Sequence, residues 1–131
     1  MNAMFAVMET TVPWFTCVLR RSYGVAQGIH FGPGGSVVAW PSAMSGALPV
    51  ESGVALAFRR EIEAADDPDA RRAELEDEMA KAQSVMPRAE EYGVHDLIDP
   101  RETRARVCDW LDEIQHELAA GLGPRAYTPR P

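Results

Sequence analysis

The sequence predicts an α/β fold with few strands followed by mostly helices. Two short apolar runs that are typical of buried strands flank a glycine-rich stretch within residues 14–40. From Glu51 onward, apolar residues recur at the spacing of amphipathic helices. With 131 residues and 46% hydrophobic content, the chain has the size and composition of one domain with a core. Because a sheet of two or three strands is rarely stable alone, we expect the end of a larger α/β domain.

The N-terminal part of the chain contains the predicted strands. Residues 3–10 fit an amphipathic helix, and Pro13 prevents its continuation. Residues 14–19 are rich in aromatic and apolar side chains and predict a buried strand. The glycine-rich stretch, residues 22–35, follows, and residues 36–40 predict a second short strand. A loop between two strands is therefore expected at the glycines.

A long helix is predicted after a bend at residues 46–49. Its apolar stripe begins near Glu51 and consists of Val54, Ala57, Phe58, Ile62 and Ala65. These residues recur at one helical face, so the pattern predicts one continuous helix that packs on a partner element.

A second, strongly acidic helix follows. Asp67 and Pro68 are the residue types that favour the cap and the first position of a helix. Its apolar stripe consists of Leu75, Met79, Ala82 and Met86. Pro87 interrupts this pattern, and Gly93 is the predicted end of the helix.

The last helix has the clearest start signal. Residues 94–98 predict a short extended segment, and residues 99–102, Asp-Pro-Arg-Glu, resemble a capping box. The stripe consists of Val107, Trp110, Leu111, Ile114 and Leu118. Gly121 is the predicted end, and the proline-rich residues 122–131 predict a flexible tail.

The composition argues against several classes of function. The chain has 13 basic and 20 acidic residues, a net charge of −7 and no basic block, so we expect no nucleic-acid partner. No run approaches the roughly 20 apolar residues of a membrane span, and the N-terminus lacks a signal-peptide pattern. Cys17 and Cys108 show no zinc-ligand spacing. We therefore expect reduced core thiols, no metal in this chain, no membrane contact and a cytoplasmic location.

The glycine-rich stretch, SYGVAQGIHFGPGG, allows two interpretations. Glycine is the commonest turn residue, so the stretch is by itself more typical of a turn without a ligand. Glycine also lets a ligand approach backbone N–H groups closely. His30 has a side chain suited to proton transfer, but beside Phe31 it is more typical of a packed loop residue. For His95 and His116 we expect surface positions.

Several motifs together resemble one enzyme family. They are VPWFTCVLRRSYGVAQG, VVAWPSA, ESGVALAFRREIEAADDPDARRAELEDEMAKA and YGVHDLIDPRETR. In residues 1 to about 115, the chain resembles the C-terminal portion of the carboxyltransferase (beta) subunit of biotin-dependent acyl-CoA carboxylases, of the propionyl-CoA or acetyl-CoA carboxylase type. This resemblance implies the C-terminal part of a crotonase-like domain of the ClpP/crotonase superfamily, lacking the whole first half of the subunit.

The resemblance also implies site residues. Family members move a carboxyl group from carboxybiotin to the α-carbon of an acyl-CoA, and negative charge develops on carbonyl oxygens that backbone N–H groups stabilise. Val25 and Ala26 match the catalytic pair whose N–H groups hold the biotin oxygen in the family, although Val25 replaces a residue that is often glycine. Gly24 allows the turn into this pair. Gly28 matches a position that lines the acyl pocket, and its small size favours chains longer than acetyl.

The resemblance further implies which molecules this chain acts with. The resemblance implies an acyl-CoA substrate, biotin carried on a biotin carboxyl carrier or biotin carboxylase subunit, and a complementary carboxyltransferase chain or a homo-oligomer. Residues 1–121 would be the carboxyltransferase part and residues 122–131 the tail. Two alternatives stay open: a non-catalytic truncated paralogue that acts as an assembly module, and a crotonase-type acyl-CoA hydratase or decarboxylase.

Overall fold

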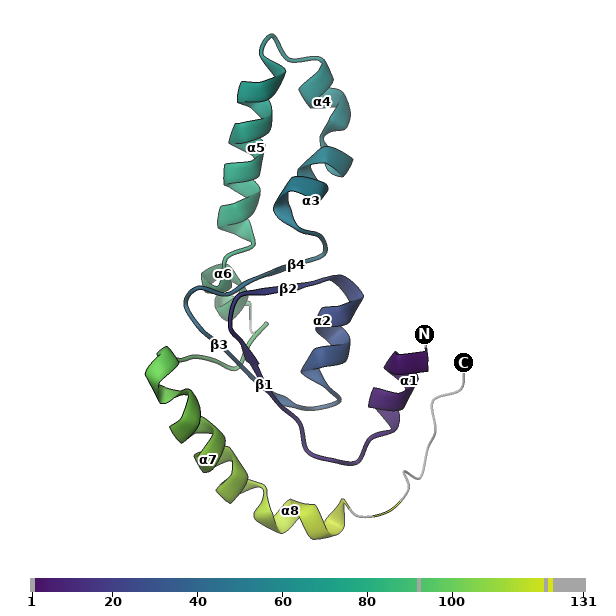
Figure 1. The fold of residues 1–131 in the computed structure, drawn as a ribbon, viewed down its shortest axis with the longest axis vertical. Coiled ribbons are helices and arrows are strands. Elements are labelled where there is room, and N and C mark those ends of the chain that lie inside the picture. Colours follow the sequence, from purple (N-terminus) through teal and green to yellow (C-terminus); the bar gives the residue numbers. More distant parts are fainter. Residues whose placement is uncertain (1, 92, 122, 124–131) are drawn as a thin grey trace.

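The structure is a computed structural model that describes residues 2–91, 93–121 and 123 (Figure 1). The predicted tail therefore lies outside the described residues except for Gly123. In chain order the elements are α1 (Asn2–Glu9), β1 (Phe15–Val18), β2 (Arg21–Tyr23), α2 (Gly24–Phe31), β3 (Ser36–Ala39), β4 (Met44–Gly46), α3 (Val50–Ala57), α4 (Arg59–Glu63), α5 (Pro68–Ala82), α6 (Val85–Glu90), β5 (Asp96–Leu97), the 3₁₀ helix η1 (Pro100–Glu102), α7 (Thr103–Glu113) and α8 (Gln115–Ala120).

The strands form two small parallel sheets. One sheet has the order β1-β3-β5, with Phe15 opposite Ser36 and Val38 opposite Asp96. The other pairs β2 with β4. The predicted strands at residues 14–19 and 36–40 are confirmed as β1 and β3, and the extended segment at 94–98 contains β5. The strands β2 and β4 were not predicted, because three-residue segments with serine and glycine carry no alternating apolar pattern.

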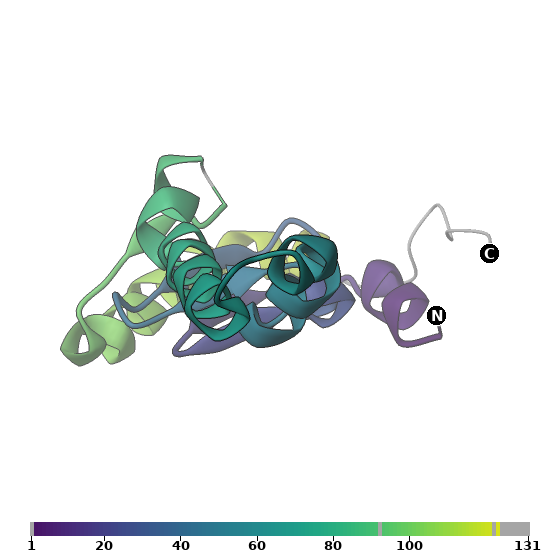
Figure 2. The same ribbon diagram turned by 90° about the horizontal axis from the view of Figure 1, so that it is seen from above.

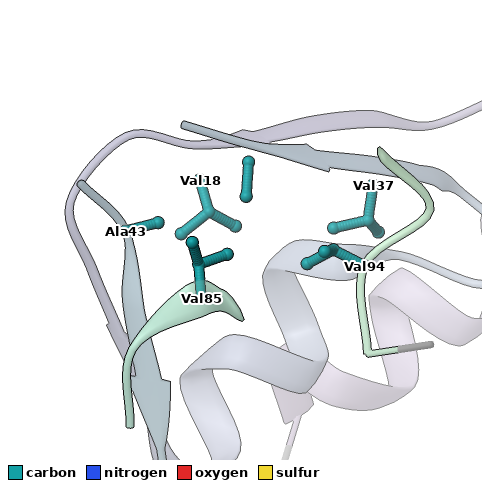
Figure 3. Close-up of a cluster of buried hydrophobic side chains, with 6 residues drawn as sticks. Val18, Val37, Ala43, Val85 and Val94 are labelled. Atoms are coloured by element: carbon teal, nitrogen blue, oxygen red, sulfur yellow. The ribbon is translucent and has the colours of Figure 1, made fainter. Parts of the chain in front are cut away.

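Two separate clusters form the core. Beside the sheets, Val18, Val37, Ala39, Ala43, Val85 and Val94 are buried together (Figure 3). The second cluster consists of Val54, Ile62 and Leu75, packed with Phe58 and Met79. It lies between α5 and the pair α3 and α4, which lie side by side in both views (Figures 1 and 2). These three helices form a helical hairpin that projects away from the sheets (Figure 1).

The helix starts were predicted better than the helix continuations. Asp67 Oδ1 accepts hydrogen bonds from the N–H groups of Asp69 and Ala70, at 3.2 and 3.0 Å, and Asp99 forms a capping box with Glu102. Hydrogen bonds from the Arg101 side chain and N–H lower the pKa of Asp99. These starts confirm the predicted caps.

Three predicted helices are wrong in their extent. The stripe from Glu51 predicts one helix, but the chain leaves helical geometry at Phe58 (φ −114°, ψ 15°) and divides into α3 and α4. The last helix divides into α7 and α8 at Ile114. The acidic helix ends at Ala82, and α6 begins after Ser84 with Pro87 in its first turn, where a missing N–H costs little.

His95 has a structural role that the sequence did not indicate. Its ring is at an exposed position, as expected, but Nδ1 accepts a hydrogen bond of 2.8 Å from the N–H of Val37 in the central strand. Val37 is 5% exposed, so water does not readily replace this acceptor.

We expect His95→Ala to lower the free energy of unfolding by about 1–3 kcal/mol, because the Val37 N–H loses its acceptor. His95→Asn places a carbonyl oxygen near the position of Nδ1 and is the matched control, with a smaller expected loss. Urea unfolding of both variants beside the unmodified chain measures the difference. Equal losses for the two variants would contradict the role of the hydrogen bond.

Candidate functional site

The glycine-rich stretch is mostly a helix, which corrects the prediction of a loop. Strand β2 ends at Tyr23 in extended geometry (φ −130°, ψ 150°), and α2 begins at the next residue. Gly24 makes this turn with a φ of +65°, and a Cβ atom at this position would lie 3.3 Å from the carbonyl oxygen of Ala47. A left-handed φ in a tight approach favours glycine. Gly24 therefore sets the point at which the strand becomes a helix.

The start of α2 presents N–H groups that have no acceptor within the helix. The N–H groups of Gly24, Val25 and Ala26 precede the first intrahelical bond, so they have no acceptor within the helix. The Tyr23 side chain does not cap them. The positive end of the helix dipole adds to their potential. This end of α2 is suited to binding a negatively charged oxygen.

An open hollow of about 720 Å³ lies beside this helix end. It is lined by Gly24, Val25, Gln27, Gly28, Phe31, Gly46, Ala47, Arg88 and Gly93. A Cβ atom at Gly28 would meet no other group within 4 Å, so this position faces free space. The structure thus brings Gly24, Val25 and Gly28 together on one hollow, whereas Ala26 shares the helix end but does not line the hollow.

The opposite end of α2 is anchored on β1. The carbonyl oxygen of His30 accepts hydrogen bonds from Trp14 Nε1 at 2.8 Å and from Thr16 Oγ1 at 2.7 Å. At Gly32, a Cβ atom would lie 2.3 Å from Trp14 Cγ, so only glycine fits beside the indole. These contacts hold α2 next to β1 and fix the direction of its axis (Figure 1). The backbone of His30 has this structural role, and its ring is exposed.

The cysteines differ from the expectation of two core thiols. Both are free, but Cys108 is exposed on α7 and only Cys17 is half-buried. Burial raises the pKa of Cys17, which keeps it in the thiol form. Among the described residues, no group of three or more His, Cys, Asp or Glu side chains is placed to hold a metal ion. No described helix has the length and apolar character needed to cross a membrane.

Arg88 is the site residue that sequence reasoning missed. It comes from α6, far from the glycine-rich stretch in the sequence, and it lines the same hollow. A single arginine in a charged segment carries no pattern that could have identified it, because only the fold brings α6 to α2.

Comparison with known proteins shows which family this geometry belongs to. Residues 2–120 match the carboxyl transferase domain family. The chain belongs to the carboxyl transferase family. It is 40% identical over 113 residues to the 12S subunit of methylmalonyl-CoA carboxyltransferase from Propionibacterium freudenreichii subsp. shermanii. This match covers 83% of this chain and 22% of that protein. It is 38% identical over 109 residues to the carboxyltransferase subunit of propionyl-CoA carboxylase from Haloferax mediterranei, covering 79% of this chain and 21% of that subunit.

A solved structure supports the same assignment. The transcarboxylase 12S structure, with methylmalonyl-coenzyme A and methylmalonic acid bound, superposes with a TM-score of 0.81 at 34% identity. The match covers 99% of this chain and 24% of that one. The resemblance noted from the motifs and the crotonase-like α/β class are thereby confirmed. This carboxyl transferase chain spans about a fifth of the length of the curated relatives it matches.

Proposed function

We propose that this chain is part of an acyl-CoA carboxylase carboxyltransferase that transfers a carboxyl group from carboxybiotin to the α-carbon of an acyl-CoA. In this assignment the chain supplies the biotin-side oxyanion donors. The observation that carries the proposal is the start of α2, where the N–H groups of Val25 and Ala26 have no acceptor within the helix and Val25 lines an open hollow. That geometry occurs in a member of the carboxyl transferase family.

The proposed contribution of this chain is electrostatic. Carboxybiotin, carried on a partner protein, supplies the carboxyl group when it is bound. The N–H groups of Val25 and Ala26 donate to the biotin ureido oxygen, and Gly24 directs the chain into this pair. Backbone dipoles that are already oriented need no reorganisation when charge develops, and they do not titrate. The anchoring of His30 to Trp14 and Thr16 keeps these donors in place.

The site fits this role in its residues as well as in its backbone. The hollow is lined largely by glycines and other small or neutral residues, which leaves space for a planar group against the backbone. Gly28 forms part of the wall for the acyl chain in this proposal. Val25 is 69% exposed, and its side chain narrows the approach to the hollow without removing the N–H.

Reconstitution tests the proposed activity directly. The chain is mixed with a carboxyltransferase polypeptide that contains the segments present in the relatives and absent here, and transfer of a labelled carboxyl group from carboxybiotin to propionyl-CoA is measured. Transfer by the mixture that exceeds the transfer by either component supports the proposal. A stable complex without transfer would instead support the non-catalytic assembly module, and hydration or decarboxylation of an acyl-CoA would support the crotonase-type alternative.

The proposed partners follow from the same assignment. The 12S structure is described as a hexamer assembly with substrate binding to a multienzyme core. For this chain we propose an acyl-CoA substrate, a biotin carboxyl carrier or biotin carboxylase subunit, and a complementary carboxyltransferase chain or further copies of itself. Residues 1–121 would form the carboxyltransferase part, and the complex would be cytoplasmic.

We expect the isolated chain to self-associate or to bind a complementary carboxyltransferase chain stably. Its parallel sheets have few strands, although parallel sheets are normally covered on both faces. Large apolar side chains are exposed over much of the molecule, at Met8, Val12, Leu19, Val25, Leu48, Leu56, Met86, Leu111 and Leu118. Sedimentation velocity measures the state of the chain. A single monomeric boundary together with cooperative unfolding would count against this prediction.

A further inference from the structure

One charged residue lines the α2 hollow. Arg88 from α6 lines it together with Val25 and Gly28, and no other lining residue in the described chain is charged. The Arg88 side chain is 35% exposed, so most of it is covered. Its Nε is buried and has no hydrogen-bond partner among the described residues. An arginine with a buried, unused donor at a hollow is unusual, because buried polar groups are normally hydrogen-bonded.

Packing holds this guanidinium at the hollow. Gly93 lies against it, and a Cβ atom at that position would be 3.2 Å from both Cζ and Nε of Arg88. The N–H of Gly93 also donates to the carbonyl oxygen of Arg88 at 2.7 Å, which closes the turn after α6. The absence of a side chain at Gly93 therefore leaves room for the guanidinium.

The nearest acidic partner leaves the arginine available. Nη1 of Arg88 lies 3.6 Å from Oε2 of Glu91, beyond hydrogen-bond distance, and the Glu91 side chain is 70% exposed. Exposed ion pairs of this kind contribute little to stability. A bound anion can therefore replace Glu91 at low cost.

We propose that Arg88 binds a carboxylate in this hollow, namely the carboxyl group that the reaction transfers. The inference rests on the proposed function, because it assigns a ligand group to the same site. A guanidinium presents a planar fork of donors that matches a carboxylate. Arg88 lines the same hollow as Gly24 and Val25 at the start of α2, so a bound carboxylate meets positive potential from two elements. Arg88 is thus a substrate-binding residue.

The same carboxylate reaches the site from two sources. It is attached to biotin before transfer and to the acyl-CoA after transfer. Propionyl-CoA and methylmalonyl-CoA differ by this one carboxylate. A comparison of their dissociation constants therefore measures whether Arg88 binds the carboxylate when it is attached to the acyl-CoA. The KM for carboxybiotin measures whether Arg88 binds the carboxylate when it is attached to biotin.

The experiment uses the complex of this chain with the complementary carboxyltransferase polypeptide. For Arg88→Gln we expect at least about tenfold weaker binding of methylmalonyl-CoA, or at least about a tenfold higher KM for carboxybiotin, with propionyl-CoA binding changed less than about twofold. Arg88→Lys keeps the charge but loses the fork, so we expect a smaller change in the same direction. Glu91→Gln removes the carboxylate that competes for Arg88. Whichever constant Arg88→Gln raises, the dissociation constant for methylmalonyl-CoA or the KM for carboxybiotin, should fall by about twofold in Glu91→Gln. Arg72→Gln, at an exposed position on α5, is the matched control.

Each result decides the proposal. Equally weaker binding of methylmalonyl-CoA and propionyl-CoA would mean that Arg88 binds the CoA phosphates. Unchanged dissociation constants for both CoA esters together with an unchanged KM for carboxybiotin would mean that Arg88 binds none of these ligands. Either result overturns the proposal. If Arg88→Gln fails to assemble, as judged by sedimentation, the comparison is made with Arg88→Lys. If the unmodified complex transfers no carboxyl group, the proposed function fails, while the two CoA esters still test whether Arg88 binds a carboxylate.

Discussion

Replacing Ala26 with proline is expected to slow carboxyl transfer in the reconstituted enzyme by about 10²-fold or more, the usual effect of removing one oxyanion donor. Proline lacks the N–H, and the Ala26 N–H has no role in the hydrogen bonding of α2. The loss should therefore fall on kcat rather than on folding. The measurement is the single-turnover rate of transfer from carboxybiotin to propionyl-CoA.

The structure itself contains a precedent for this substitution. Helix α6 begins after Ser84 and carries Pro87 at its third position. Ala26 is at the third position of α2, after Tyr23. Proline in the first turn of a helix removes an N–H that is unsatisfied in any case, so we expect the Ala26→Pro variant to keep its helix. Circular dichroism and sedimentation check this expectation.

His30→Ala is the matched control on the same helix. The carbonyl of His30 anchors α2, but its ring is exposed, so truncation should alter transfer far less than Ala26→Pro. If His30→Ala abolished transfer and Ala26→Pro left it intact, the assignment of the oxyanion donors would be wrong, and the imidazole would become the candidate for proton transfer.

Local signals in the sequence predicted the parts of the fold that depend on local chemistry. The caps at Asp67 and Asp99 are predictable because the capping side chain and the N–H groups it accepts from lie within three residues. By contrast, Phe58 and Ile114 lie in continuous apolar stripes with no glycine or proline beside them, so nothing local indicates that the helices divide there.

Helix α2 was missed because its stability is supplied by distant residues. Gly24 and Gly28 lower the helix propensity of an eight-residue segment that would be unstable alone. Trp14 and Thr16, from before and within β1, bind its last turn and hold it in place. The backbone donors at Val25 and Ala26 are proposed from a family resemblance. The hollow itself and Arg88 depend on α6 reaching α2, which no local pattern predicts.

Gly28→Ile is expected to change the acyl-chain preference of the reconstituted enzyme. The unmodified enzyme should accept chains longer than acetyl, because Gly28 lines the hollow and a Cβ atom there would meet nothing within 4 Å. An isoleucine side chain would occupy the space of about three methylenes at about 0.8 kcal/mol each, which corresponds to a loss of about 50-fold in kcat/KM for long acyl-CoA. Activity with acetyl-CoA should change much less.

Gly28→Ala separates this steric effect from an effect on the helix. Alanine stabilises a helix interior by about 1 kcal/mol relative to glycine and adds only one methyl group, so we expect firmer folding with a nearly unchanged chain-length profile. The measurement is kcat/KM for acetyl-, propionyl- and longer acyl-CoA with both variants beside the unmodified enzyme. A strict preference of the unmodified enzyme for acetyl-CoA, or an unchanged profile in Gly28→Ile, would remove Gly28 from the acyl pocket. A loss of activity that is equal for all chain lengths would place Gly28 against a part of the substrate that all acyl-CoA molecules share.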